Sequence, residues 1–193
     1  MMRALVLFAH PVADSFSAAL RRVAVERLEA RRWDVDDCDL YAEKFAPALT
    51  SEERLNYHDP EFNRASVASY VERLTRADAL VLVFPVWNFG YPAILKGFFD
   101  RVFLPGVSFR LVDGKVLPNL KNIRRLAAVT TYGGSRIRAI WAGDPPRKIV
   151  TRSLRATCQA EKTRYIALYD MNRADKPRRA AFIARVEGEM DRF

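Results

Sequence analysis

Three aromatic side chains alternate along one short segment of the sequence, Trp87, Phe89 and Tyr91, with Gly90 between the last two. The segment follows residues 79–83, a continuous apolar run typical of a parallel strand buried on both faces. Ligands of open α/β sheets bind beyond the carboxyl ends of such strands. Aromatic side chains also fill ordinary cores, but in a loop they are more typical of a recognition surface. We therefore interpret the segment as a flat apolar platform for a planar ring system such as a flavin.

A second candidate segment, residues 10–17, follows the first apolar run and is rich in hydroxyl groups. It would place Ser15 and Ser17 at the start of a helix, where unpaired backbone N–H groups favour an anion such as a phosphate. His10 would lie beside them. The segment has neither the G-x-G-x-x-G fingerprint nor the glycine spacing of a P-loop. The alternative is structural, namely that Asp14 or Ser15 only caps the helix.

The third segment, residues 130–135, contains Thr131 and two consecutive glycines, Gly133 and Gly134. Glycines allow positive φ angles or a close approach of the backbone, and the threonine hydroxyl and nearby N–H groups could hydrogen-bond the carbonyl oxygens of a ring. The alternative is an ordinary turn before a helix. Together the three segments predict a phosphate site, an aromatic platform and a polar edge. This combination favours a mononucleotide with a planar ring, for which FMN is the natural candidate.

Strand-like and helix-like patterns alternate along the chain and predict an α/β fold, a doubly wound, five-stranded parallel sheet with helices on both faces. A single domain is expected over residues 1–193. The expected strands cover residues 3–9, 34–40, 79–84, 126–131 and 164–168, and the expected helices cover residues 15–32, 51–55, 66–76, 92–103, 144–158 and 176–192. The first, third and fourth strands are the most apolar and should lie at the centre of the sheet. Residues 41–64 are expected to form a long excursion, of a length that is often functional, and residues 104–122 another loop.

The net charge of +9 does not by itself indicate nucleic-acid binding. Of the 32 basic residues 25 are arginine, and they are scattered over helix-like segments instead of forming one block. The two cysteines give neither a disulfide framework nor a metal-ligand cluster, so no metal is expected. No apolar run approaches the roughly 20 residues of a membrane span, and the first residues show no signal-peptide organisation. We expect a cytoplasmic, reduced protein in which Cys38, Cys158 and His58 have no functional role.

Residues 92–103 read Pro-Ala-Ile-Leu-Lys-Gly-Phe-Phe-Asp-Arg-Val-Phe. Together with residues 84–91, 10–17 and 130–134, this run resembles the NAD(P)H:quinone oxidoreductase family of flavodoxin-like flavoproteins. The resemblance is to the short bacterial form, whose relatives include the modulator-of-drug-activity and potassium-efflux ancillary oxidoreductases, and it extends from residue 3 to about residue 168. It implies a flavodoxin-like fold and an enzyme that transfers two electrons by hydride from NAD(P)H through bound FMN to a quinone or similar acceptor.

The same resemblance implies roles for particular residues. The phosphate and ribityl end of the flavin would be held by His10, Ser15, Phe16 and Ser17. Its ring would be lined by Pro85, Val86, Trp87, Asn88 and Phe89, and its pyrimidine side closed by Thr130, Thr131, Gly133 and Gly134. No side chain is needed as a nucleophile, and Asn88 and Tyr132 would lie near the reacting ring. The short chain favours FMN over FAD. The family is typically homodimeric, and residues 41–64 are expected to contribute to the interface.

The chain departs from the larger quinone reductases after the double glycine. Those proteins carry a Tyr and a His there, whereas residues 135–144 contain neither, and Arg136 or Arg138 could take over their electrostatic role. The electron acceptor and the choice between NADH and NADPH therefore stay open. Two alternatives use the same cofactor: a regulatory flavoprotein subunit docked on a membrane transporter such as a potassium-efflux system, and a reductase of azo or nitro compounds.

Overall fold

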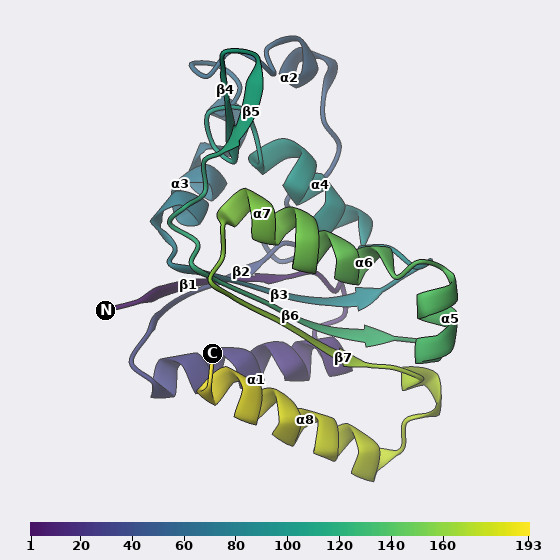
Figure 1. Cartoon of the computed structure of the whole chain (residues 1–193). Coiled ribbons are helices and arrows are strands. Elements are labelled where there is room, and N and C mark those ends of the chain that lie inside the picture. The colour runs from purple at the N-terminus through teal and green to yellow at the C-terminus, as the bar shows by residue number, and fades with distance from the viewer.

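A five-stranded parallel sheet runs through the middle of the molecule in this computed structural model, which describes all residues from 1 to 193 (Figure 1). The strand order is β2-β1-β3-β6-β7. The strands are β1 (Arg3–Phe8), β2 (Asp34–Asp39), β3 (Ala79–Val86), β6 (Arg125–Tyr132) and β7 (Lys162–Leu168). The prediction of a parallel α/β sheet is confirmed, and so is the central position of the first, third and fourth predicted strands. The mixed-polarity strand β2 lies at an edge, as its sequence indicates.

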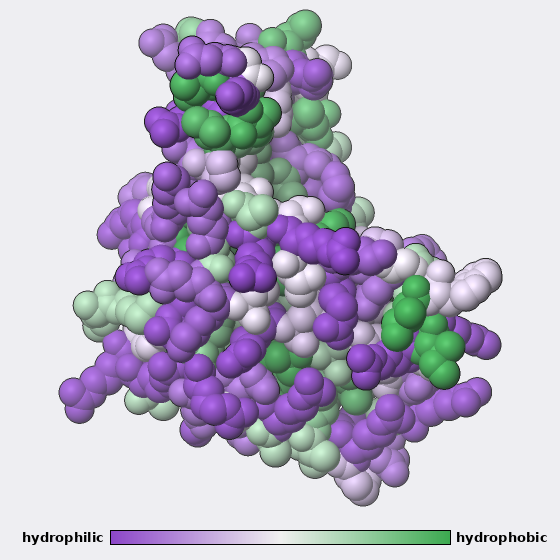
Figure 2. Space-filling view, viewed as in Figure 1, coloured by the Kyte–Doolittle hydropathy of each residue, from purple (hydrophilic) through white to green (hydrophobic).

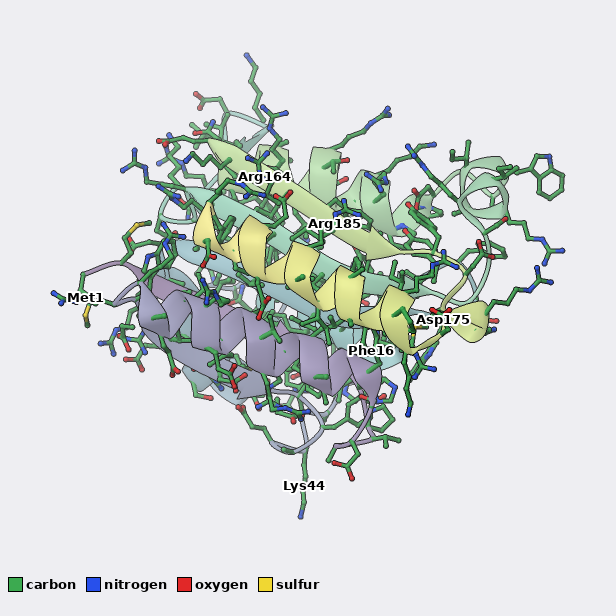
Figure 3. The ribbon with its side chains drawn as sticks, turned by 90° about the horizontal axis from the view of Figure 1, so that it is seen from below. Met1, Phe16, Lys44, Arg164, Asp175 and Arg185 are labelled. Carbon is green, nitrogen blue, oxygen red and sulfur yellow. The ribbon has the colours of Figure 1, made fainter.

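Helices cover both faces of the sheet. Seen from below, α1 (Phe16–Ala30) and α8 (Lys176–Asp191) lie side by side across one face (Figure 3). The other face carries α3 (Ala68–Arg76), α4 (Ala93–Val102) and a continuous helical run made of α6 (Pro145–Lys148), the π-helical segment η2 (Ile149–Leu154) and α7 (Arg155–Cys158).

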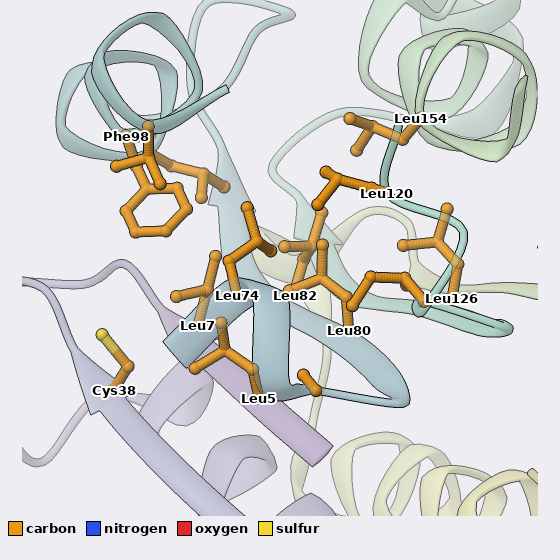
Figure 4. Packing of buried hydrophobic residues seen from close by; sticks show 14 of the residues in the cluster. Leu5, Leu7, Cys38, Leu74, Leu80, Leu82, Phe98, Leu120, Leu126 and Leu154 are labelled. Carbon is orange, nitrogen blue, oxygen red and sulfur yellow. The ribbon is translucent and has the colours of Figure 1, made fainter. Parts of the chain in front are cut away.

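Successive side chains of each strand point to opposite faces of the sheet, so the core is divided into two parts, one under each helical layer. Leu5 and Leu7 of β1 point to the α3–α4 side, where Figure 4 shows them packed with strand residues below Phe98 of α4. Ala4 and Val6 point to the opposite side and pack under α1 and α8. Because both faces of the central strands are buried, their sequences are mainly apolar. The fully buried strands hold the backbone at their carboxyl ends rigidly in place.

Residues 104–122 are not the simple loop that the sequence predicted. They contain an antiparallel hairpin of β4 (Phe109–Val112) and β5 (Lys115–Pro118) that projects beyond the helices α3 and α4. Its turn consists of Asp113 and Gly114, which both have positive φ angles, 49° and 74°. Asp-Gly is a preferred pair for such a two-residue turn, so the sequence did contain the signal.

The structure also changes several predicted helices. A short helix missed by the prediction, α5 (Arg136–Trp141), follows the double glycine and begins at the capping residue Ser135. A 3-10 turn, η3 (Met171–Arg173), follows β7, and another, η1 (Ala65–Val67), precedes α3. The predicted short helix over residues 51–55 is confirmed as α2 (Ser51–Leu55). Pro92 is the N-terminal cap of α4 and not a residue of its first turn.

The excursion between β2 and α3, residues 41–64, is anchored on α4. Gly97 of α4 lies so close to the backbone of Pro47 that an added Cβ would come within 2.5 Å of its Cα. One turn further along α4, the guanidinium of Arg101 is paired with the carboxylate of Glu53 and donates to the backbone oxygen of Ala46. A glycine and an ion pair on one helix thus fix a segment that lacks regular structure over most of its length.

None of the helices in the structure combines the length and the apolar character that crossing a lipid bilayer requires.

Candidate functional site

A cleft of about 590 Å³ opens at the carboxyl ends of β1, β3 and β6. This volume lies within the range of small-molecule and cofactor sites. The three segments singled out in the sequence meet there, and a fourth segment, after β7, closes the cleft. Its twelve lining residues are His10, Ser15, Phe16, Ser17, Pro85, Val86, Trp87, Asn88, Thr131, Gly133, Met171 and Asn172.

The turn from β1 into α1 presents donors to this cleft. The Ser15 hydroxyl accepts a hydrogen bond from the backbone N–H of Ala18 at 3.1 Å, so Ser15 is the helix cap. The cap leaves the hydroxyl proton free to donate, and the N–H groups of Phe16 and Ser17, in the first turn, have no acceptor within the helix. Capping and ligand binding are therefore compatible at this position. The helix dipole adds to the attraction for an anion.

His10 lies where this turn meets the aromatic segment. Its Nδ1 accepts a hydrogen bond from the backbone N–H of Val12 at 3.0 Å. In the neutral imidazole the proton is then on Nε2, which is left as a donor. The ring of His10 lies 5.8 Å from that of Trp87, centre to centre. The two side chains together form one wall of the cleft.

The aromatic segment after β3 forms a tight, strained turn. Trp87 and Gly90 exchange two backbone hydrogen bonds, of 3.2 and 2.8 Å. The two residues between them, Asn88 and Phe89, have φ angles of 47° and 57°. A large side chain rarely adopts such angles, and backbone strain of this kind persists where surrounding structure enforces it, often at functional sites. The turn leaves Trp87 41% and Phe89 47% exposed.

Tyr91 does not belong to this exposed platform, contrary to the sequence-based interpretation. Its ring packs edge-on against Phe84 and Phe99, at interplanar angles of 69° and 63°, and its hydroxyl donates to the backbone oxygen of Pro146 at 2.9 Å. The three aromatic side chains do not share one exposed surface, because the tight turn reverses the chain at Gly90. Tyr91 is therefore part of the core beneath the site.

Only one of the two predicted threonines reaches the cleft. Thr131 lines it, whereas Thr130 is completely buried and its hydroxyl has no hydrogen-bond partner. Consecutive side chains of a strand point to opposite faces, so β6 can present only one of this pair. The assignment of Thr130 to the site is therefore corrected.

The double glycine allows neighbouring groups to approach the backbone closely, and it does not provide a positive φ angle. Neither Gly133 nor Gly134 is among the residues with positive φ. A Cβ added to Gly133 would lie 3.1 Å from Nδ2 of Asn172, which is tighter than ordinary packing, whereas one added to Gly134 would meet only the Arg138 side chain at 3.9 Å. Gly133 is thus the position where a side chain would crowd the cleft.

A second cavity of about 310 Å³, which we call the clamp cavity, adjoins the cleft and shares four lining residues with it. The remaining predicted residues, Phe89 and Gly134, line this second cavity. So does Arg138, whereas Arg136 faces away from it. The complete lining is Val86, Asn88, Phe89, Tyr132, Gly133, Gly134, Ser135, Arg138, Ala139 and Asn172.

Tyr132 lines the clamp cavity with its ring while its hydroxyl is held in a buried network. The hydroxyl donates to Oδ1 of Asp144 at 2.6 Å and lies 2.6 Å from the hydroxyl of Tyr165. Arg147 donates to the other oxygen of Asp144 at 3.0 Å. Burial, followed by these neighbours, raises the pKa of Tyr132 far above that of a free tyrosine. Tyr132 therefore keeps its proton and acts as a fixed part of the wall.

Met171 and Asn172 are lining residues that the sequence analysis missed. They belong to η3, directly after β7. The rule that ligands bind at the carboxyl ends of parallel strands applies to β7 as well. We missed them because their segment contains none of the glycines, aromatic runs or hydroxyl clusters that marked the other three.

Comparison with known proteins agrees with this geometry. Residues 2–190 match the model of the family described as flavodoxin-like fold, and the chain therefore belongs to that family. It is 34% identical over 156 residues to NAD(P)H dehydrogenase [quinone] 1 of Cavia porcellus, a match covering 72% of this chain and 57% of that protein. The chain thus spans somewhat more than half the length of this curated relative.

Solved structures resemble nearly the whole chain, and two of them illustrate the likeness. The NAD(P)H:quinone oxidoreductase from Methanothermobacter marburgensis superposes with a TM-score of 0.84 at 25% identity, covering 98% of both chains. An FMN-dependent NADH-azoreductase from Bacillus anthracis, solved in complex with FMN, gives a TM-score of 0.80 at 17% identity and covers 100% of this chain and 99% of that one. The second likeness concerns the fold alone.

Proposed function

We propose that this protein is a flavin-dependent NAD(P)H oxidoreductase that binds FMN in the cleft and transfers two electrons to a quinone or similar acceptor. The observation that carries the proposal is the convergence of three unlike features on one cleft: a helix start with free donors, an exposed aromatic turn and a polar strand end. The quinone reductases among its relatives support the same activity.

The residues present fit a flavin mononucleotide. The helix start at Phe16 and Ser17 offers backbone N–H donors for a phosphate. Trp87 supplies an apolar surface for a planar ring. Gly133 keeps open a space that a Cβ would narrow against Asn172. Phosphate donors, a flat apolar wall and a small polar edge are the chemistry that this ligand needs.

Each part of the cleft then has a defined task. The N–H groups of Phe16 and Ser17 would bind the phosphate, and His10 would be a further donor through Nε2. The aromatic turn would orient the ring and shield it from water. Thr131 and the N–H of Gly133 would offer donors to the polar edge of the ring, where fixed donors stabilise negative charge without reorganisation. FMN, when bound, supplies the two-electron chemistry, so no side chain of this chain has to act as a nucleophile.

The cysteines take no part in this proposal. Both Cys38 and Cys158 are free and buried. Burial raises the pKa of the Cys158 thiol to about 12, and that of Cys38 is raised as well, so neither forms the reactive thiolate. His58 is exposed, as expected. Two free thiols support our proposal that the protein works in the cytoplasm.

We also propose that a single flavodoxin-like domain over residues 1–193 carries the site and that the protein is a homodimer. Exposed apolar side chains support the second point. Leu55 and Phe62, in the excursion that the sequence analysis assigned to the interface, are 86% and 61% exposed. In Figure 2 hydrophobic side chains gather at the top of the molecule, over α2 and the β4–β5 hairpin. A second copy covering this region would bury them.

The absorption spectrum of the purified protein tests the cofactor proposal directly. We expect a yellow protein that releases FMN on heat denaturation, identified by chromatography, and that oxidises NADPH or NADH in the presence of a quinone. Release of FAD would correct the choice of cofactor. A colourless protein that also fails to take up added FMN would overturn the proposal. Comparing a quinone with an azo dye as acceptor then identifies the class of acceptor.

A further inference from the structure

A third cavity, with a strongly basic lining, lies beside the clamp cavity. It encloses about 320 Å³ between α5 and the helical run that begins at Pro145, and we call it the basic pocket. Figure 1 places both helices near the carboxyl ends of the central strands, where the proposed flavin site opens. The lining residues are Arg136, Ile140, Gly143, Asp144, Arg147, Lys148, Thr151 and Arg152.

The charges around this pocket are not balanced. Asp144 is the only carboxylate in the lining, and it is already paired with Arg147 at 3.0 Å. Arg136, Lys148 and Arg152 form no ion pair. Elsewhere in the chain a single arginine meets two carboxylates, as Arg73 meets Asp36 and Glu43. Several unneutralised positive charges on one small pocket fit an anionic ligand.

The unusual helix geometry creates this convergence. Arg147 and Arg152 are five residues apart, and in an α-helix of 3.6 residues per turn they would point about 140° away from each other. Arg147 precedes the π-helical segment η2, Ile149–Leu154, and Arg152 lies within it; the wider turn of η2, with its i→i+5 hydrogen bonds, reduces the angle between them, and both residues line the basic pocket. Such π segments are rare and occur frequently at functional sites.

The basic pocket is physically connected to the proposed flavin site. Asp144 lies in its wall and accepts a hydrogen bond at 2.6 Å from Tyr132, whose ring lines the clamp cavity. α5 separates the two cavities, with Arg138 on the clamp side and Arg136 on the other. The two cavities therefore lie on the two sides of one short helix, over which an elongated ligand would have to pass to contact both.

We propose that the basic pocket binds the 2′-phosphate of NADPH and makes the enzyme selective for NADPH over NADH. The inference rests on the proposed function, because it assigns the co-substrate of that same site. A phosphate monoester carries about 1.5 to 2 negative charges and three acceptor oxygens, and guanidinium groups bind such oxygens in pairs. NADH lacks this group, so its binding gains nothing from Arg136, Lys148 and Arg152.

Two small probes test the pocket without turnover. Adenosine 2′,5′-bisphosphate and 5′-AMP differ only in the 2′-phosphate, and their binding to the flavin-loaded protein can be measured by calorimetry. We expect the bisphosphate to bind at least about tenfold more tightly, as charge-assisted hydrogen bonds at one phosphate allow. Equal binding of the two probes would overturn the assignment of the 2′-phosphate.

The double variant K148Q/R152Q tests which residues are responsible. Both side chains are exposed, so the variant should fold like the parent protein. We expect the tighter binding of the bisphosphate to be lost, and the ratio of kcat/KM for NADPH to that for NADH to fall about tenfold through KM. R155Q, on the same helical run but outside the basic pocket, should change neither quantity.

The two proposals can fail separately. A protein that oxidises neither nucleotide but binds the bisphosphate in preference to 5′-AMP through Lys148 and Arg152 would refute the oxidoreductase and leave the phosphate pocket standing. An active enzyme whose NADPH-to-NADH ratio is unaffected by K148Q/R152Q would refute the pocket and leave the oxidoreductase standing.

Discussion

Trp87 is the side chain that most directly tests the proposed ring platform. Its backbone is held by two hydrogen bonds to Gly90 that do not involve the indole, so Trp87→Ala should leave the turn in place. Stacking of an aromatic side chain on a base contributes about 1–3 kcal/mol, and we expect FMN affinity to fall about tenfold. Titration of the flavin-free protein with FMN, followed by flavin fluorescence, measures this change.

A second exposed tryptophan supplies the matched control. Trp141 is 91% exposed on α5 and lines neither the cleft nor the clamp cavity. Trp141→Ala should leave FMN affinity unchanged. Equal affinities of the parent protein and the Trp87→Ala variant would show that the indole is not part of the flavin site.

Removing the hydroxyl oxygen of Tyr132 tests the structural role of this side chain. Tyr132→Phe keeps the ring in the clamp cavity but removes the donor to Asp144 and the partner of Tyr165. Leaving buried polar groups without partners costs about 1–3 kcal/mol, so the free energy of unfolding in urea should fall by about that amount. Tyr41→Phe is the control, because the Tyr41 hydroxyl makes no side-chain hydrogen bond. An equal loss of unfolding free energy in Tyr132→Phe and Tyr41→Phe would contradict a stabilising role of the hydrogen-bond network.

At the scale of elements, sequence alone predicted the buried strands well and the connections poorly. The strands β1, β3 and β6 each contain an unbroken apolar run, over residues 4–8, 79–86 and 126–129, because both faces are covered there. This local signal needs no knowledge of the remaining fold. The hairpin turn at Asp113 and Gly114 was missed because the flanking residues are only half apolar. The helix α5 was missed because its six residues leave most of their apolar side chains exposed.

The candidate site likewise has features that the sequence predicted and features that it did not. Three of the four segments that line the cleft could be predicted because they follow strands and carry unusual residue types, whereas the segment of Met171 and Asn172 carries no such residues. The details of the segments could not be predicted, because they depend on backbone geometry. Thr130 and Thr131 look alike in the sequence, and only the direction of β6 decides which of them reaches the cleft. The network from Tyr132 to Asp144 depends on a left-handed residue at Asp144, with a φ angle of 44°, which no pattern in the sequence announces.

The attachment of the excursion to α4 should depend on acid pH. Burial acts to raise the pKa of Glu53, but hydrogen bonds from Arg101, Ser66 and the Thr50 backbone lower it to about 2. Since this pKa is below the value of 4.5 for an ordinary glutamate, the ionised carboxylate stabilises the fold above about pH 4.5. That stabilisation is lost as the pH falls towards 2.

Glu53→Gln should therefore lower the free energy of unfolding by about 1.5–3 kcal/mol at pH 7, and the difference from the parent protein should shrink below about pH 4.5. Urea denaturation at pH 7, 4 and 3 measures both effects. Glu52→Gln, on the neighbouring exposed side chain without an ion pair, is the control. A difference that stays constant between pH 7 and 3 would exclude the charge of Glu53 as its cause.

For the whole molecule, the strand order explains why one cleft collects so many segments. β1, β3 and β6 are neighbours in the sheet although they are distant in the sequence, and β3 pairs with both of the others. Their carboxyl ends therefore deliver the helix start, the aromatic turn and the polar strand end to adjacent positions. The hairpin and the excursion lie outside this arrangement, and Figure 1 shows them projecting together above the helices.

The prediction about assembly concerns this projecting region, which consists of the hairpin and the excursion. Leu111 and Val116 are directly opposite each other in the hairpin and are 56% and 65% exposed. Asn63 of the excursion donates to the backbone oxygen of Pro105 at 3.1 Å, so the excursion and the base of the hairpin are held together. An apolar cross-strand pair of this kind on a rigid support fits an interface core, from which charged residues are depleted.

The double variant L111E/V116E should convert the proposed dimer to a monomer, because it places two carboxylates in the interface of each copy, where burying unpaired charge is costly. Light scattering coupled to gel filtration measures the mass directly, with an expected halving. Arg185→Glu on α8 changes the net charge by the same two units on an exposed face remote from the hairpin, and should leave the dimer intact.

A parent protein that is monomeric at every concentration would refute the dimer. A double variant that stays dimeric would move the interface away from the hairpin, and the exposed apolar residues of α5, Ile137 and Trp141, would then be the next face to change.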